Sequence, residues 1–278
     1  MTRNDRSGKG KPFGKQGAGP KKRDFSKGEK PSRQRPSAKS TGNKDEIRLN
    51  KFIANAGICS RRDADMHIAV GSVTVNGKVV TEMGYKVKIT DEVRFDGQRI
   101  YPEKPEYILL NKPKGFLATT KDEKGRKTVM DLIANATDAR VVPVGRLDRP
   151  TTGLILFTND GQMAKKLTNA ANDIRQIYHV SLDRKLSQAD FNKIKEGITL
   201  DDGLAEVDEI SWVHGATKRE VGIKIHSIRH RLVRRIFESL NYEIVSLDRV
   251  VFAGLTKKDL PRGHWRHLTK QEVINLGM

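Results

Sequence analysis

Strand and helix patterns intermix without a regular repeat from residue 106 onward, and this limits the fold more than any other feature of the sequence. Helical spacing of apolar residues predicts helices over 162–167, from Ser187 onward and over 231–240. Apolar or alternating runs predict strands at 107–110, 141–144, 153–157, 177–182, 221–225 and 244–247. Because no strand–helix–strand unit recurs, we predict an α+β fold with a mixed sheet, rather than a doubly wound sheet, over 106–278.

Residues 47–100 form a second patterned region, which we predict to be a small α/β module. Apolar residues at helical spacing predict a helix over 49–56. Ser60 has the position of an N-cap for a second helix that runs to about residue 70. Two alternating strands then flank an Asn76-Gly77 hairpin turn, and apolar residues within 87–95 predict a further strand pair.

Residues 1–46 differ in composition from the rest of the chain. They are rich in Gly, Pro and Ser, and they contain 14 Lys and Arg against five Asp and Glu, a net charge of +9. Such a segment buries too little apolar surface to offset the entropy lost on ordering, so we predict a disordered basic tail. It can act by long-range attraction to phosphates, or as a solubilising tail without specific contacts.

The charge of the whole chain narrows the class of partner. The net charge is +19 and the isoelectric point is about 10.0, which favours binding to a polyanion or to a membrane surface. No apolar run approaches the roughly 20 residues that a membrane span needs, and no signal-peptide pattern is visible. Cys59 is the single cysteine, which excludes a disulfide within the chain and a cysteine zinc cluster. We therefore expect a cytoplasmic protein with a nucleic-acid partner and no metal.

Basic residues crowd the two predicted helices of the small module. Arg48 directly precedes the first helix and Lys51 lies on it, and Arg61 and Arg62 open the second, where free backbone N–H groups favour phosphate. A solvated basic face is the alternative interpretation. The pattern over 48–77, with Asn50, Gly57, Ser60 and the Asn-Gly turn in order, resembles the S4 RNA-binding domain over most of 47–96. The resemblance implies docking onto structured RNA.

The segment Gly145-Arg146-Leu147-Asp148-Arg149 holds the most telling carboxylate. Asp148 lies between two arginines, at the end of a predicted strand and before a Thr-Thr-Gly turn. The neighbouring cations favour its ionised form, and an ionised carboxylate in a pocket can act as a nucleophile or a base. From these residues alone, a structural salt bridge is the more common arrangement.

The longer context resembles the signature of pseudouridine synthases. Asp148 is followed at the family's spacing by Thr152-Gly153-Leu154 and then by Asn159-Asp160-Gly161. The motifs at 111–115, 177–180 and 229–237 resemble, in order, other motifs of the same family. More narrowly, they are similar to the RsuA/RluB branch, and with the S4-like module the resemblance covers about residues 47–275.

The resemblance implies an isomerase that converts uridine to pseudouridine in RNA without a cofactor. The uracil leaves ribose C1′, turns and rejoins through C5. Asp148 is then the essential carboxylate, Tyr178 the tyrosine that packs on the uracil, and Arg234 the cation that pairs with Asp148, with Arg235 as the second choice. Arg146 can fill the space left by a flipped nucleotide. With the basic residues of both regions, the predicted RNA-binding set is Arg48, Lys51, Ser60, Arg61, Arg62, Asn76, Lys112, Lys114, Arg146, Arg229, Arg231 and Arg235.

Two stretches depart from the family pattern. The arginine motif usually begins Gly-Arg-Asn-Arg, but here Ile228 replaces the glycine and His230 replaces the asparagine, with Leu232 after Arg231. Loss of the glycine disfavours positive φ at 228. Pro150 follows the catalytic Asp-Arg pair, where it removes an N–H donor. We expect activity to be retained, with altered affinity for RNA.

The predicted function is site-specific isomerisation of uridine in ribosomal RNA, with the large-subunit 23S RNA preferred because of the chain length and the 254–263 ending. The alternatives are the same chemistry on small-subunit 16S RNA, a non-catalytic ribosome-assembly factor, or a basic tether that needs only the tail and the S4-like module. Nothing in the sequence demands more than a monomer.

Overall fold

The structure, a computed structural model, describes residues 46–278. The basic tail that we predict over 1–46 lies outside the described residues, except for Glu46. Within the described part, no helix is both long enough and apolar enough to span a bilayer.

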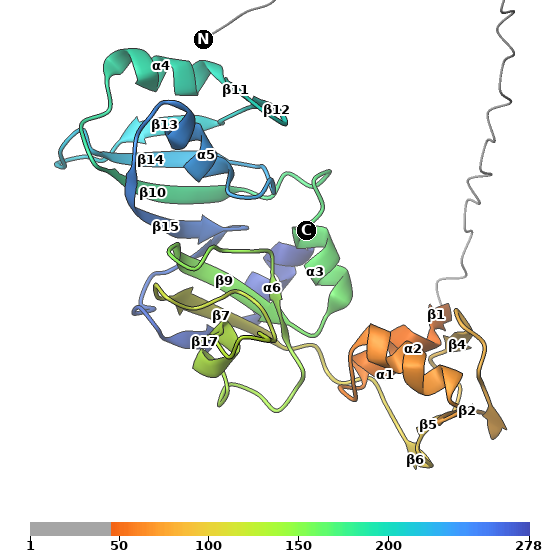
Figure 1. The fold of residues 1–278 in the computed structure, drawn as a ribbon. Helices are drawn as coiled ribbons and strands as arrows, with labels where there is room; N and C mark the ends of the chain where they lie inside the picture. The colour runs from red at the N-terminus through yellow and green to blue at the C-terminus, as the bar shows by residue number, and fades with distance from the viewer. Residues whose placement is uncertain (1–45) are drawn as a thin grey trace, which may run out of the picture. The chain divides into compact units, whose positions relative to one another are not determined.

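Residues 46–99 contain two short helices and six short strands (Figure 1). The helices pack on the strands around a cluster that includes Phe52, Ile53 and Val73. Strands β3, β2, β5 and β6 form one antiparallel sheet, and β1 pairs with β4. The elements are α1 (Leu49–Asn55), α2 (Arg61–Ala69), β1 (Glu46–Arg48), β2 (Val73–Val75), β3 (Lys78–Val79), β4 (Lys86–Lys88), β5 (Val93–Phe95) and β6 (Gln98–Arg99).

Local signals in this region predict its structure well. The Ser60 hydroxyl accepts from the Asp63 backbone N–H, and the Asp63 carboxylate accepts from Ser60, which completes a capping box at the start of α2. Asn76 and Gly77 adopt φ values of 49° and 79°, as a tight hairpin turn requires. Strands form at both ends of the predicted 87–95 pair, but they do not pair with each other: β4 pairs with β1, and β5 pairs with β2 and β6.

The remaining strands form one large mixed sheet and a small hairpin. The order in the large sheet is β13-β14-β10-β15-β9-β7-β17, and only the β15–β9 contact is parallel, which confirms the α+β prediction. The strands are β7 (Tyr107–Lys112), β8 (Val142–Val144), β9 (Thr152–Thr158), β10 (Gln176–Leu182), β11 (Ile198–Leu200), β12 (Gly203–Ala205), β13 (Glu209–Trp212), β14 (Glu220–Ile225), β15 (Ile244–Phe252), β16 (Leu255–Thr256) and β17 (Trp265–His267).

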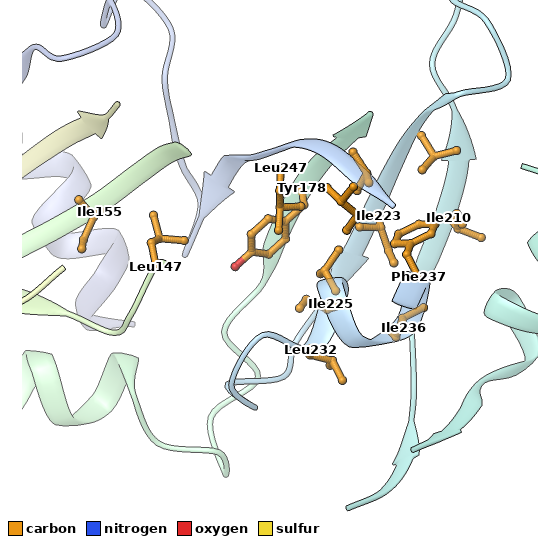
Figure 2. Close-up of a cluster of buried hydrophobic side chains, with 14 of the residues drawn as sticks. Leu147, Ile155, Tyr178, Ile210, Ile223, Ile225, Leu232, Ile236, Phe237 and Leu247 are labelled. Carbon is orange, nitrogen blue, oxygen red and sulfur yellow. The ribbon is translucent and has the colours of Figure 1, made fainter. Parts of the chain in front are cut away.

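Helices cover the sheet on different faces (Figure 1). The helices here are η1 (Val129–Leu132), α3 (Gly161–Leu167), α4 (Gln188–Glu196), α5 (Leu232–Ser239) and α6 (Lys270–Gly277). Apolar residues of α5 pack with those of β10 and β14, among them Phe237 and Ile223 (Figure 2). A separate cluster on the other face of β7 and β9 joins Leu154 to Leu167 of α3 and Leu276 of α6. Strand β9 is therefore buried along its whole length.

The parallel contact between β9 and β15 is held by backbone proximity and by a buried carboxylate. Gly153 has φ +106°, and a Cβ there would overlap the backbone of Arg249. The carboxylate of Asp248 accepts from Thr152 Oγ1 at 2.8 Å and from Arg262 Nη1 at 2.9 Å, and it pairs with Lys257. Burial raises the pKa of Asp248, but hydrogen bonds from Arg262, Lys257 and Thr152 outweigh burial and lower it to about 2. This charge cluster therefore joins the C-terminal segment to the centre of the sheet.

Candidate active site

Asp148 lies in the loop between β8 and β9, at the edge of a cavity. The backbone N–H of Thr151 donates to the carbonyl of Asp148 at 3.1 Å and closes a turn. Pro150 lies inside this turn, whose closing hydrogen bond does not use the N–H that proline lacks. The Asp148 side chain remains 22% exposed, so a ligand in the cavity can reach it.

Lys112 lies beneath this loop at the end of β7, and it is fully buried. Its ammonium donates to the carbonyls of Thr151 at 2.7 Å, Asp148 at 3.1 Å and Arg149 at 3.3 Å, and to that of its neighbour Pro113 at 3.2 Å. Burial lowers the pKa of Lys112 to about 8, against the opposing charge of Asp148. The structure thus corrects our expectation for Lys112: its ammonium is used inside the protein to hold the Asp148 loop, and it is not exposed to RNA.

Three basic side chains approach the Asp148 carboxylate from the segment before and within α5. Arg231 Nε lies 3.1 Å from Oδ2, His230 Nε2 lies 3.6 Å from Oδ1, and Arg234 Nε lies 4.0 Å from Oδ2. Arg234 is the most buried of the three, with 13% of its side chain exposed. Opposite charges at these distances hold the Asp148 side chain toward the start of α5. Arg235, our second choice for this partner, instead pairs with Asp201 and Asp202.

The arginine motif, which lacks the family's glycine at 228, has a left-handed backbone conformation at Arg231 instead. Ile228 is not among the residues with positive φ, but Arg231 adopts φ 53° at the N-cap of α5. A non-glycine residue in this left-handed region carries a conformational cost, which is tolerated mainly at turns and functional sites. The residue with this left-handed conformation is the same one whose side chain contacts Asp148.

Tyr178 projects from β10 into the same cavity. The residue is 9% exposed, its ring packs in the apolar cluster beside Leu247 and Ile225, and its hydroxyl end points toward Leu147 (Figure 2). The hydroxyl lies 2.9 Å from Gln176 Oε1. Leu147 immediately precedes Asp148, so the apolar part of the tyrosine and the loop with the carboxylate border one space.

That space is a cavity of about 210 Å³. The wall combines apolar side chains with an acid, a phenol, an amide, hydroxyls, an imidazole and guanidinium groups, and a cavity with a few converging polar groups is typical of ligand sites. The polar residues include Asp148, Gln176, Tyr178, Arg231, Arg234 and Arg249. Arg146 and Arg229 also border it. The structure thus brings the three predicted catalytic residues to one cavity, and their catalytic roles remain predictions.

Two of the predicted RNA-binding arginines are paired with an acidic hairpin. Arg229 Nε donates to Asp202 at 3.1 Å and Arg229 Nη1 to the carbonyl of Leu204 at 2.7 Å. Arg235 Nη1 donates to Asp202 at 2.9 Å. Hydrogen bonds from Arg235 and Arg229 hold the pKa of Asp202 well below its usual range. The turn between β11 and β12 therefore orients the segment that presents cations to Asp148.

The other predicted RNA-binding residues differ in solvent exposure and in whether their side chains bond within the protein. Arg48, Arg61, Arg62, Lys114 and Arg146 are exposed, and Lys51 is half-buried. Two polar residues of the set are used inside the fold: Ser60 caps α2, and the side chain of Asn76 bonds Asp91 and the backbone of Glu92. RNA contact by these residues remains a prediction.

Sequence reasoning missed two polar residues of the cavity, Gln176 and Arg249. The strand that holds Arg249 was predicted to end at residue 247, whereas β15 continues to Phe252. The signal present was the consecutive pair Asp248-Arg249 before the apolar Val250 and Val251. Charged residues inside an apolar strand indicate a buried polar network. Among the described residues, no group of three or more His, Cys, Asp or Glu side chains is arranged to hold a metal ion.

Two protein families match this chain. The RNA pseudouridylate synthase family matches residues 106–239, and the S4 domain family matches residues 47–93. A solved structure described as that of a pseudouridylate synthase superposes with a TM-score of 0.58 at 27% identity, over 83% of this chain and 99% of that one.

Relatives of known sequence agree with these matches. The ribosomal large subunit pseudouridine synthase B of Bacillus subtilis is 39% identical over 82% of this chain and 95% of its own length. The dual-specificity RNA pseudouridine synthase RluF of Escherichia coli is 36% identical over 83% of this chain and 78% of its own length. With an S4 domain ahead of a mixed-sheet domain whose cavity holds Asp148, Tyr178 and Arg234, this chain belongs to the RNA pseudouridine synthases, a family of isomerases.

Proposed function

We propose that this protein isomerises one or more uridines of ribosomal RNA to pseudouridine, with large-subunit RNA as the substrate and Asp148 as the essential carboxylate. The observation that carries the proposal is the ionisable Asp148 at a cavity edge, with Arg231 at 3.1 Å and Arg234 at 4.0 Å, in a chain of this family. The name of the Bacillus subtilis relative, which this chain matches over 95% of its length, supports the large subunit.

The reaction sets what the site has to do. The N1–C1′ bond of uridine breaks, a C5–C1′ bond forms, the C5 proton leaves and N1 gains a proton, so the overall change is an isomerisation. The target nucleotide has to leave its stack before a carboxylate can reach the sugar or the base. Asp148 then acts on C1′, on C6 or in proton removal from the sugar. Tyr178 packs on the uracil, and Arg234 pairs with the carboxylate and orients it.

The exposed cations of the S4 domain are proposed to dock the enzyme on structured RNA. Arg61 and Arg62 open α2, where the capped helix N-terminus favours phosphate, and Arg48 is close in sequence at the start of α1. The domains in this proposal are a basic tail at 1–46, an S4 domain at 47–100 and a catalytic domain at 106–278. We propose that the protein acts as a monomer in the cytoplasm.

Release of tritium from uracil C5 tests the reaction directly, because the C5 proton is lost only when the new bond forms there. We expect release from large-subunit RNA and little from small-subunit RNA. The Asp148→Asn variant is expected to bind RNA within about threefold of the unchanged protein and to lose release by at least about a thousandfold. Asp138→Asn, an exposed substitution with the same change in charge, is the control.

Each other outcome selects a different function. Release from small-subunit RNA alone would reassign the substrate. Tight binding without release from any ribosomal RNA would favour a non-catalytic assembly factor. Unchanged release after Asp148→Asn would overturn the role of that carboxylate. Full function of a fragment without residues 106–278 would indicate a basic tether.

A further inference from the structure

Arg249 is fully buried at the wall of the active-site cavity, and the reaction outlined above does not use it. It lies on β15, which pairs antiparallel with β10. Ile177 pairs with Val251 and Tyr178 pairs with Arg249, so the register shifts at Val250. In unbroken pairing Val250 would face Tyr178. The β-bulge therefore places a guanidinium beside the tyrosine, as bulges near active sites commonly redirect a side chain.

The contacts of Arg249 lead to Tyr178. Its Nε donates to the carbonyl of Leu154 at 2.8 Å, and its Nη1 donates to Gln176 Oε1 at 3.1 Å. Its guanidinium carbon lies 4.3 Å from the centre of the Phe252 ring. Its Nη2 has no hydrogen-bond partner among the described residues, although it is buried. An unsatisfied buried donor is costly and calls for an explanation at the site where it occurs.

The bonds of Gln176 fix the direction of its amide. Arginine is only a donor, so the Gln176 atom that faces Arg249 has to be the oxygen. The amide nitrogen then donates to the carbonyl of Ser227 at 3.1 Å, which a flipped amide could not do. Because Gln176 Oε1 only accepts, the Tyr178 hydroxyl at 2.9 Å has to donate its proton to it. With its proton committed to Gln176, the tyrosine oxygen can only accept hydrogen bonds from its other neighbours.

We propose that Arg249 and Gln176 are positioning residues that commit the Tyr178 hydroxyl proton to Gln176, so that Tyr178 presents a hydrogen-bond acceptor to the target nucleotide. The proposal rests on the proposed function for the role of Tyr178, but the hydrogen-bond direction does not depend on it. Burial lowers the pKa of Arg249, and the neighbouring Tyr178 opposes this shift. Arg249 Nη1 and the Tyr178 hydroxyl both donate to Gln176 Oε1, so the cation and the phenol share one acceptor.

Substitution of Gln176 tests the proposal more safely than substitution of Arg249, because loss of a fully buried guanidinium would leave a cavity in the sheet. Gln176→Leu is expected to lower kcat for tritium release by about tenfold to a hundredfold with KM within about twofold. Gln176→Glu keeps an acceptor for Arg249 and Tyr178 but loses the donor to the Ser227 carbonyl, so it is expected to recover most of the kcat lost in Gln176→Leu but not all of it.

A double-mutant cycle separates this role from general stability. In the Tyr178→Phe background, where no hydroxyl remains to be oriented, Gln176→Leu should lower kcat by less than about threefold further. Tyr242→Phe is the matched control, because Tyr242 is also a buried tyrosine, but its hydroxyl bonds Asp190 instead. In that background the full effect of Gln176→Leu should persist. Independent effects of Gln176→Leu and Tyr178→Phe would overturn the proposal.

A second measurement requires no catalysis. Tyrosine labelled with ¹³C at the ring carbon that bears the hydroxyl gives separate signals for O–H and O–D when hydroxyl exchange is slow. In an equal mixture of light and heavy water, we expect a resolved pair for Tyr178, assigned by its absence in Tyr178→Phe and lost in Gln176→Leu. A single averaged signal in the unchanged protein would overturn the proposal even if the enzyme is active. Absence of tritium release with a resolved pair would instead count against the proposed function.

Discussion

Arg231 Nε lies 3.1 Å from Asp148 Oδ2, closer than any other cation among the described residues, yet 43% of the Arg231 side chain is exposed. Arg234 is 4.0 Å away but only 13% exposed. The difference in distance changes the Coulomb energy by about a third, whereas a change in effective dielectric constant from about 80 to about 20 changes it about fourfold. Burial therefore outweighs proximity here.

We accordingly predict that Arg234→Met lowers kcat/KM by about a hundredfold and Arg231→Met by about tenfold. The loss in Arg231→Met should shrink as salt is raised, because an exposed pair is screened. Tritium release at two salt concentrations measures both effects. Arg219→Met, which removes an exposed arginine, is the control and should change release by less than about twofold. A larger loss for Arg231→Met than for Arg234→Met would contradict the argument.

Lys112→Met is predicted to lower the free energy of unfolding by about 2–4 kcal/mol, because several carbonyls of the Asp148 loop lose a buried donor. The pKa of Lys112 is about 8 in the folded protein against 10.5 ordinarily, so unfolding takes up a proton between these pH values. The free energy of unfolding of the unchanged protein, relative to the variant, should therefore rise from pH 8 toward pH 10.5. Urea unfolding of both proteins at pH 7.5 and 9.5 measures this difference. A decrease of the difference with pH would contradict a lowered pKa of Lys112 in the folded protein.

Asp202→Asn is predicted to strengthen RNA binding. It weakens the pairing of Arg229 and Arg235 with the β11–β12 turn and removes one negative charge close to them. We expect affinity to rise by about threefold to tenfold at low salt, with a steeper dependence of affinity on salt. The free energy of unfolding should change little, since ion pairs at the protein surface contribute little to it. Filter binding over a salt series measures the affinity, and Asp138→Asn controls for net charge. Equal gains in the two variants would argue against a local effect.

Gly153→Ala is predicted to destabilise the protein by more than about 3 kcal/mol, because the added methyl group would overlap the Arg249 backbone and φ is +106°. Gly161→Ala is the matched control: it lies at the start of α3, with no atom within 4 Å of the added Cβ. That variant should be neutral or slightly stabilised. Urea unfolding of the two variants decides the matter, and a stable Gly153→Ala protein would mean that β9 and β15 can separate.

The parts of the structure that could be predicted from sequence are those with local signals. Ser60 and Ser187 cap helices where expected, because the bonds of an N-cap involve residues two or three positions away. The Asn76-Gly77 turn has a similar local origin. Asp148 could be singled out only through its ordered motif context, since a carboxylate between arginines is otherwise ordinary.

The features that escaped prediction depend on contacts between distant parts of the chain. Lys112 is indistinguishable in sequence from the neighbouring exposed Lys114, and only the fold places its ammonium beneath the Asp148 loop. The sequence pattern predicts that this strand ends before Asp248, but β15 continues because Arg262 stabilises Asp248 and Gln176 stabilises Arg249, contacts that no local pattern reveals. The acidic partner of Arg229, Asp202, is likewise 27 residues away in sequence.

The consecutive residues Asp248 and Arg249 leave β15 on opposite faces, one toward Lys257 and the other toward Gln176. A slip of β15 by one residue would exchange them, because side chains alternate along a strand. The guanidinium would then lie beside the cations Lys257 and Arg262. The carboxylate would face the acceptor oxygens that now bind Arg249. Two adjacent and opposite charges thus fix the register of β15 in the sheet. Strand β15 borders the catalytic cavity, and the two charges allow it only one alignment against its neighbours β9 and β10. The folded protein therefore holds the cavity wall in one register even without substrate.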